Sequence, residues 1–223
     1  MKNKPLFITY KNSDFENAAA LFFKKILSDL LISNEIVNIA LSGGGTPLPI
    51  YEKLKEYDLE WERINFFLVD ERCVPIKDTR SNFGNIKNIF FDFVHSKTFS
   101  IVKEGISFDE ATKHYSEEIL KCLPVINNIP KFDLIILGMG LDGHTASLFP
   151  NTLALEEKNK LIVLNDIPQL GEKRITMTFP LIENASKIVL LIKGDNKKKV
   201  LNECFDKKLP IMKLFNHLYA VLS

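Results

Sequence analysis

The most reactive combination of side chains in this sequence lies in a glycine-rich segment, residues 137–150 (LGMGLDGHTASLFP). It follows an apolar run, residues 132–137, which predicts a buried strand that ends where the glycines let the backbone turn sharply. The imidazole of His144 can act as a general base near neutral pH and deprotonate water. Because Asp142 lies two residues earlier, we predict that His144 and Asp142 act together in catalysis.

Two other interpretations of this segment are weaker. Gly138, Gly140 and Gly143 match the dinucleotide-binding fingerprint, which needs a crossover helix after the third glycine. Only six residues separate Gly143 from Pro150, and a proline in a helix interior costs roughly 3 kcal/mol. Ser147 lacks the flanking glycines of a hydrolase nucleophile elbow. Activated water is therefore the simpler nucleophile.

A second glycine-rich loop, residues 42–47 (SGGGTP), lies between a predicted strand and a predicted helix. Its backbone N–H groups and the helix N-terminus can bind an anion, and three consecutive glycines exceed what a plain turn needs. It is not a Walker A loop, because Thr46 stands where the lysine would follow the last glycine. We predict that the phosphate-binding residues here are Ser42, Gly43, Gly44 and Thr46.

A charged motif, residues 69–75 (VDERCVP), ends another predicted strand. If the strands are parallel, this motif lies at the same sheet edge as residues 42–47. The planar guanidinium of Arg72 suits a phosphate or a carboxylate, and Asp70 is a further candidate for a catalytic side chain. Taken alone, the motif is equally compatible with a surface ion pair, which contributes little stability.

The composition restricts the partners that this chain can have. Its 223 residues are 46% hydrophobic and 26% charged, which is ordinary for a globular protein and sufficient for one large domain. The formal net charge is +1, so no overall field favours nucleic acid or a membrane surface, and any anion site must be local. The one basic run, residues 197–199, is typical of a solvated helix face. We expect a protein that binds neither nucleic acid nor membranes.

Cysteine and histidine spacing argues against a metal site. Cys73, Cys122 and Cys204 form no CxxC pair, which indicates reduced thiols rather than a disulfide framework. The four histidines form no HxxxH or HExxH pair, so we expect no metal. The first residues lack the apolar core of a signal peptide, and we expect a cytoplasmic protein.

Helical and strand patterns alternate along the chain. Apolar spacing and capping residues predict helices at residues 13–33, 46–57, 107–122 and 195–205, with Ser13 or Asp14, Thr46 and a Ser107–Glu110 capping box at the first three N-termini. Short apolar runs predict strands at residues 36–41, 64–69, 132–137, 160–164, 174–178 and 187–192. This alternation predicts an α/β fold with a mostly parallel sheet and helices on both faces. We find no linker, so residues 1–223 are expected to form a single domain.

Five motifs together resemble the 6-phosphogluconolactonase family, in the order in which that family has them. They cover the chain from about residue 41 to 200 and are residues 41–47 (LSGGGTP), 70–75 (DERCVP), 81–85 (SNFGN), 138–150 (GMGLDGHTASLFP) and 174–178 (RITMT). The C-terminal segment, residues 209–223, departs from the family pattern because it lacks a tryptophan and an acidic residue.

The resemblance implies a modified Rossmann-like fold and hydrolysis of 6-phospho-D-glucono-1,5-lactone to 6-phospho-D-gluconate in the oxidative pentose phosphate pathway. It implies no metal or organic cofactor. His144 would activate water, while the glycine loop, Arg72 and Arg174 would hold the substrate and its phosphate. Asn82 lies in a matching motif, and Lys197 corresponds to a lysine of related sugar-phosphate enzymes. A small sugar-phosphate lactone is the implied partner, and we expect a monomer or weak homo-oligomer.

Two alternatives remain. Glucosamine-6-phosphate deaminase/isomerase is similar in its Asp-Gly-His turn, but that turn continues to Phe-Asn-Glu-Pro, whereas Phe149 precedes Pro150 here. Arg72 also stands where the deaminase has a tyrosine. A non-catalytic sugar-phosphate sensor would leave His144 without a role, and no helix-turn-helix segment precedes residue 42.

Overall fold

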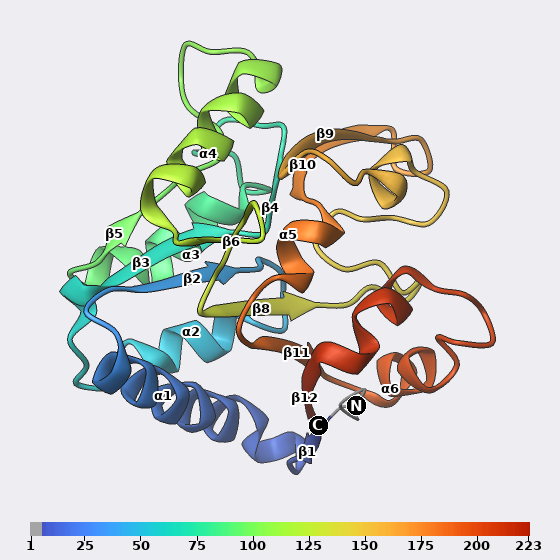
Figure 1. Cartoon of the computed structure of the whole chain (residues 1–223). Helices are drawn as coiled ribbons and strands as arrows, with labels where there is room; N and C mark the ends of the chain where they lie inside the picture. Colours follow the sequence, from blue (N-terminus) through green and yellow to red (C-terminus); the bar gives the residue numbers. More distant parts are fainter. Residues whose placement is uncertain (1–5) are drawn as a thin grey trace.

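A seven-stranded parallel sheet forms the centre of the molecule (Figure 1). The structure, a computed structural model, describes residues 6–223. In spatial order the strands are β1 (Leu6–Thr9), β12 (Leu218–Leu222), β11 (Ile188–Ile192), β8 (Leu134–Gly138), β2 (Val37–Leu41), β3 (Ile64–Leu68) and β5 (Lys97–Thr98). Every neighbouring pair is parallel. Strands β2 and β11 are buried at every position, as expected of parallel strands that are covered on both faces.

Helices cover both faces of this sheet, which confirms the predicted fold class. They are α1 (Phe15–Ser33), α2 (Leu48–Leu54), α3 (Asn82–Ile89), α4 (Phe108–Cys122), α5 (Phe179–Glu183) and α6 (Asp195–Asn202). In Figure 1, α1 and α2 lie below the sheet, and α4 and α5 lie above it. The predicted capping box of α4 is present, with Ser107 and Glu110 each accepting from the backbone of the other. The hydroxyl of Tyr115 then joins α4 to β3 through the backbone of Leu68.

The strand order places a crevice between β2 and β8. From β2 the chain continues outward through β3 and β5, whereas β8 is followed in the opposite direction by β11 and β12. The loops that leave the carboxyl ends of β2 and β8 therefore diverge. Open α/β sheets bind ligands at such a reversal of strand order. Both predicted glycine-rich loops start here, because residues 42–47 follow β2 and residues 139–150 follow β8.

A smaller antiparallel sheet lies beside this crevice. Its strands, in spatial order, are β4 (Asp70–Arg72), β10 (Glu172–Met177) and β9 (Ile162–Ile167). The predicted strands at residues 160–164 and 174–178 thus exist with shifted bounds, but they do not join the parallel sheet. Only residues 168–171 separate β9 from β10, and a parallel connection needs a crossover of a dozen or more residues. A further hairpin pairs β6 (Val125–Ile126) with β7 (Ile129–Pro130).

Several helix ends differ from the predictions. Helix α1 begins after a short 3₁₀ turn, and its N-cap residue, Asp14, makes no side-chain capping bond. Helix α2 begins at Leu48 rather than Thr46, with Pro47 at the cap, and it ends at Leu54. Thr46 therefore lies in the glycine loop and does not cap the helix, contrary to the prediction. Helix α6 ends at Asn202 and not at residue 205. The 3₁₀ segments are Asn12–Asp14, Trp61–Arg63, Phe91–Phe93, Leu153–Glu156 and Pro210–His217.

The C-terminal segment, which departs from the family pattern, is an integral part of the fold. Residues Leu218–Leu222 form β12, which pairs with β11 on one side and β1 on the other. The 3₁₀ segment before it buries Pro210, Ile211 and Leu214. Strand pairing and hydrophobic packing therefore hold this segment in the fold.

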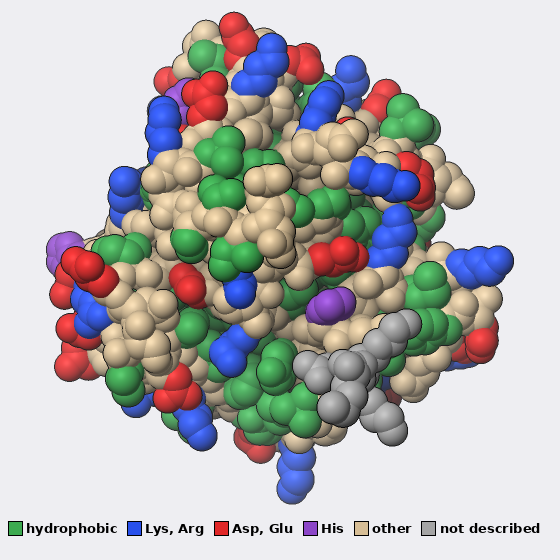
Figure 2. Space-filling view, viewed as in Figure 1, with side chains coloured by type: hydrophobic (Ala, Val, Ile, Leu, Met, Phe, Trp, Pro, Cys, Tyr) green, Lys and Arg blue, Asp and Glu red, His purple; other side chains and the backbone are tan. Residues whose placement is uncertain are grey.

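Charges of both signs are mixed on the face of the molecule that Figure 2 shows. Figure 2 shows basic and acidic side chains interspersed over one face of the molecule, in line with the net charge of +1. Within residues 6–223, no helix combines the length and apolar character that a membrane-crossing helix requires. An anion site must therefore arise from local geometry.

Candidate active site

A cavity of about 200 Å³ lies at the carboxyl ends of β2 and β8. It is lined by residues from both glycine-rich loops, from the small sheet and from α6, namely Ser42, Gly43, Gly44, Gly45, Thr46, Pro47, Asp70, Arg72, Asn82, Gly138, Met139, Gly140, His144, Ala146, Arg174 and Lys197. Every predicted site residue lines this cavity except Asp142, which lies behind His144. The structure thus brings together residues from six separate parts of the chain.

His144 and Asp142 form a directly bonded pair. The Nδ1 atom of His144 lies 2.5 Å from Oδ1 of Asp142, and the backbone N–H of His144 donates to the same oxygen at 3.2 Å. In this contact Nδ1 carries the proton and donates it in a hydrogen bond to the carboxylate, so that Nε2 is left as a proton acceptor. Burial raises the pKa of Asp142, but its hydrogen bonds and attraction to His144 outweigh burial and hold that pKa below its ordinary value. Asp142 therefore stays ionised and can stabilise a protonated imidazole.

The loop around this pair is closely packed. The N–H of Gly140 donates to the carbonyl of His144 at 2.9 Å, which closes the turn. A Cβ atom at Gly140 would lie 2.3 Å from the His144 ring, so no other residue fits without moving the imidazole. The ring of Phe149 stacks on the other side, with centroids 3.8 Å apart and planes at 22°. The imidazole is thus held by the hydrogen bond to Asp142, by the close backbone of Gly140 and by the stacked ring of Phe149.

Two arginines face each other across the small sheet. Arg72 on β4 is the direct partner of Arg174 on β10 in the antiparallel register. Like charges in directly opposite positions are destabilising, so this arrangement favours an anion near both guanidiniums. Arg174 donates through Nε and Nη2 to Glu172, and its guanidinium lies 5.2 Å from the Phe149 ring centroid. The Nη1 group of Arg72 donates to the carbonyl of Arg80, whereas its Nε is buried with no partner among the described residues.

Lys197 supplies another positive charge to the cavity. It lies in the first turn of α6, after Gly194 in a left-handed conformation (φ 93°). Burial lowers the pKa of Lys197. Its neighbours Lys198 and Lys199 lie near the carboxylates of Asp195 and Glu203, but no carboxylate of residues 6–223 pairs with Lys197. The solvated helix face predicted for this run therefore describes Lys198 and Lys199, while Lys197 is oriented toward the cavity.

The first glycine-rich loop is shaped by contacts that its glycines permit. Gly44 has a φ of 99°, which favours glycine, and a Cβ at Gly43 would lie 2.0 Å from the Asn82 side chain. Asn82 donates to the backbone carbonyl of Asp70 at 3.0 Å. The hydroxyl of Ser42 is buried without a partner among residues 6–223. An unsatisfied hydroxyl beside exposed loop amides is suited to a polar ligand.

Glu71 positions Asn82, a role that the sequence analysis missed. Its carboxylate accepts from the backbone N–H groups of Arg72, Asn82 and Phe83 and from the Ser81 hydroxyl. Burial raises the pKa of Glu71, and these four donors oppose that rise. A helix that begins directly after a Ser81 N-cap could have signalled the need for a nearby acidic side chain.

The close approach at Gly43 makes a test of the loop. We expect Gly43→Ala to lower the free energy of unfolding by roughly 1–3 kcal/mol, because the new methyl group must displace Asn82. Gly45→Ala is the matched control, since a Cβ there meets nothing within 4 Å. Thermal midpoints of both variants measure the effect. Equal midpoints would mean that the Asn82 side chain can move away at no cost and does not determine the conformation of the loop.

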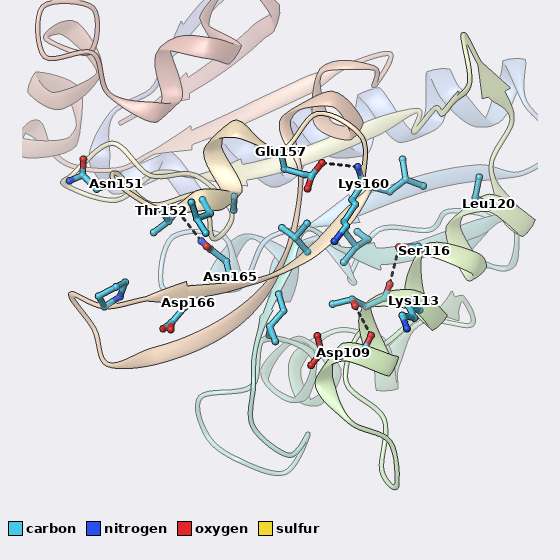
Figure 3. A pocket seen from close by; sticks show the side chains of 18 residues that line it. Asp109, Lys113, Ser116, Leu120, Asn151, Thr152, Glu157, Lys160, Asn165 and Asp166 are labelled. Atoms are coloured by element: carbon cyan, nitrogen blue, oxygen red, sulfur yellow. Dashed lines mark hydrogen bonds between the residues drawn. The ribbon is translucent and has the colours of Figure 1, made fainter.

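A larger groove of about 810 Å³ lies away from this site, between α4 and β9 (Figure 3). Asp109, Lys113 and Ser116 of α4 lie on one side, and Asn165 and Asp166 of β9 lie on the other. None of the predicted site residues lines it, and its lysines and carboxylates are mixed, so it favours no ligand of one charge. In the part of the chain that the structure describes, no three His, Cys, Asp or Glu side chains gather as metal ligands would.

Comparisons with known proteins identify the family of this chain. The family model described as glucosamine-6-phosphate isomerases/6-phosphogluconolactonase matches residues 11–218. A 6-phosphogluconolactonase of Treponema pallidum is 36% identical over 198 residues, which are 86% of this chain and 82% of that protein. One of Thermotoga maritima is 37% identical over 189 residues, or 82% of each chain. The crystal structure of 6-phosphogluconolactonase from Thermotoga maritima has a TM-score of 0.85 at 31% identity and covers 98% of this chain and 99% of its own. The chain therefore belongs to the glucosamine-6-phosphate isomerase/6-phosphogluconolactonase family.

Proposed function

We propose that this protein hydrolyses 6-phospho-D-glucono-1,5-lactone to 6-phospho-D-gluconate, a reaction of the oxidative pentose phosphate pathway. The observation that carries the proposal is the pair of facing arginines, Arg72 and Arg174, in the same cavity as His144, whose ring is bonded to Asp142. A group that binds phosphate and a group that activates water are the two requirements of this substrate. Relatives named 6-phosphogluconolactonase support the assignment.

In the proposed mechanism, Nε2 of His144 takes a proton from water, which attacks the C1 carbonyl of the lactone. Asp142 stabilises the resulting imidazolium. Negative charge develops on the carbonyl oxygen, and the loop amides stabilise it. The bond between C1 and the ring oxygen then breaks, and the protonated imidazole returns its proton to that oxygen, which becomes a hydroxyl group. Arg174, Lys197, Asn82 and the loop formed by residues 42–47 hold the rest of the substrate. Contacts with the remote phosphate orient the ring for attack.

Asp70 differs from Asp142 in its surroundings and, we infer, in its role. Its buried carboxylate lies between the Ser147 hydroxyl at 2.5 Å and the Asn82 amide at 3.3 Å. His144 instead pairs with Asp142. We therefore propose that Asp142 supports His144, which is the base, and that Asp70 holds the cavity wall in place.

The remaining assignments follow from this activity. We propose that residues 1–223 form one lactonase domain, that the protein acts in the cytoplasm and that its partner is a small sugar-phosphate lactone rather than nucleic acid. We also expect a monomer or a weak homo-oligomer. Light scattering over a range of concentrations tests the oligomeric state.

A coupled assay tests the function directly. Glucose-6-phosphate dehydrogenase generates the lactone, and its disappearance is followed with and without this protein. Faster disappearance with the protein is the expected result. Conversion of glucosamine 6-phosphate without lactone hydrolysis would instead support the deaminase alternative, for which Phe149 stands in place of a glutamate. Binding of the sugar phosphate without turnover would support a sensor.

The phosphate is expected to dominate specificity. Unphosphorylated glucono-1,5-lactone should react with a kcat/KM lower by roughly 100-fold, because it loses charge-assisted contacts worth about 1.5–3 kcal/mol each. Initial rates with the two lactones at matched concentrations measure the ratio. Equal values of kcat/KM would remove the phosphate role from Arg72, Arg174 and Lys197.

A further inference from the structure

Ser147 joins the histidine loop to all three strands of the small sheet. Its hydroxyl donates to Oδ2 of Asp70 on β4 at 2.5 Å. Its backbone N–H donates to Oγ1 of Thr176 on β10 at 3.1 Å, and its carbonyl accepts from Nδ2 of Asn165 on β9 at 2.9 Å. Ser147 and Thr176 are fully buried, and the other two partners are nearly so. One residue thus connects to three strands through its hydroxyl, its backbone N–H and its carbonyl.

The short segment before Ser147 is tied to the other sheet. The hydroxyl of Thr145 donates to the carbonyl of Gly138, the last residue of β8, at 2.9 Å. Ala146 lies between the two attachments with a φ of 48°, a conformation that costs a non-glycine residue energy and persists only where its surroundings enforce it. Residues 144–147 therefore form a tight bridge between the parallel sheet and the small sheet.

This bridge fixes the distance between two halves of the site. His144 lies on the bridge itself, while Arg72 and Arg174 lie on β4 and β10. A substrate that is held by its phosphate at one end must present its carbonyl to His144 at the other. Because a misplacement of about 1 Å can cost 10²-fold in rate, the attachment of the bridge matters to catalysis.

We propose that Ser147 is a positioning residue that sets the place of His144 relative to the two arginines. The inference rests on the proposed function. Ser147 is not itself a nucleophile, since its hydroxyl is inaccessible and its proton is donated to Asp70. Its influence on the reaction passes through His144.

Ser147→Ala removes the bond to Asp70 and keeps the backbone. We expect kcat to fall roughly 10- to 100-fold, while the inhibition constant of 6-phosphogluconate stays within about twofold, because the arginines still hold the phosphate. If Ser147 served stability alone, the variant would have a lower thermal midpoint, but its kcat would not fall while ligand binding stayed the same.

Two buried threonines provide a matched comparison. Thr176→Val removes the oxygen that accepts from Ser147, whereas Thr178→Val removes a similar buried hydroxyl that donates to the carbonyl of Lys160 at 2.7 Å. We expect both variants to lose stability, but only Thr176→Val to lose kcat. Thr176→Ser keeps the accepting oxygen and should retain kcat. These variants also carry the test if Ser147→Ala does not fold.

The outcomes separate this inference from the proposed function. If the wild type is active and Ser147→Ala and Thr176→Val keep its kcat while their thermal midpoints fall as in Thr178→Val, the positioning role is overturned and the lactonase assignment stands. A wild-type protein that does not hydrolyse the lactone would overturn both.

Discussion

Replacing His144 with Ala is expected to lower kcat by roughly 10²–10⁴-fold, because a general base contributes this much to a proton transfer. Affinity for 6-phosphogluconate should change little, since the imidazole acts on water and not on the phosphate. Steady-state kinetics and inhibition by 6-phosphogluconate measure the two quantities separately. The bonded pair predicts a smaller loss for Asp142→Asn, which leaves the ring in place but removes the charge that stabilises the imidazolium.

His114→Ala is the matched control. His114 is exposed on α4, near Lys103 and Glu118 and outside the cavity, so its replacement should leave kcat unchanged. If His144→Ala retains nearly full kcat, the stacked and bonded imidazole has a structural role and another group must activate water.

The second large effect is expected at the facing arginines. Changing Arg72 or Arg174 to Ala should lower kcat/KM by roughly 10- to 100-fold, the loss expected for a charged hydrogen bond worth about 1.5–3 kcal/mol. Lysine should restore only part of this loss, because a point charge cannot reproduce a planar bidentate fork. Values of kcat, KM and the thermal midpoint for the four variants measure the effect.

Arg80→Ala separates this role from an ordinary ion pair. Arg80 is exposed and pairs with Asp78, an arrangement that contributes little to stability. Its replacement should leave the kinetics intact, and the backbone carbonyl that accepts from Arg72 remains. Unaltered kinetics in the Arg72 variants as well would transfer Arg72 from substrate binding to the scaffold.

The features that could be predicted from the sequence are those encoded locally. The Ser107–Glu110 capping box lies within one helical turn, and the apolar run that forms β11 is continuous. The glycine-rich loops after β2 and β8 can be recognised from their composition. The carboxyl ends of parallel strands meet at one edge of the sheet. These local signals were therefore sufficient to predict that His144 and residues 42–47 lie at one crevice.

Features that depend on pairing between distant segments could not be predicted in the same way. Nothing near Asp70 indicates that β4 will pair with β10, about a hundred residues later. The opposition of Arg72 and Arg174 is a product of that register. Strand β1 has only four residues, LFIT, and shows no alternation of apolar and polar residues that would identify a strand. Ser147 was considered only as a nucleophile, because its three partners lie far away in the sequence.

The pairing of β1 with β12 has a consequence for the order of folding. Strand β1 is an edge strand whose hydrogen-bonded neighbour is β12, so its contacts span almost the whole chain. Closing so long a loop is slow, and such non-local contacts reduce folding rates. Residues Leu6–Thr9 can therefore take their place in the sheet only after Leu218–Leu222 have been synthesised. During synthesis, β1 is the first strand of the sheet to leave the ribosome, but its partner β12 is the last.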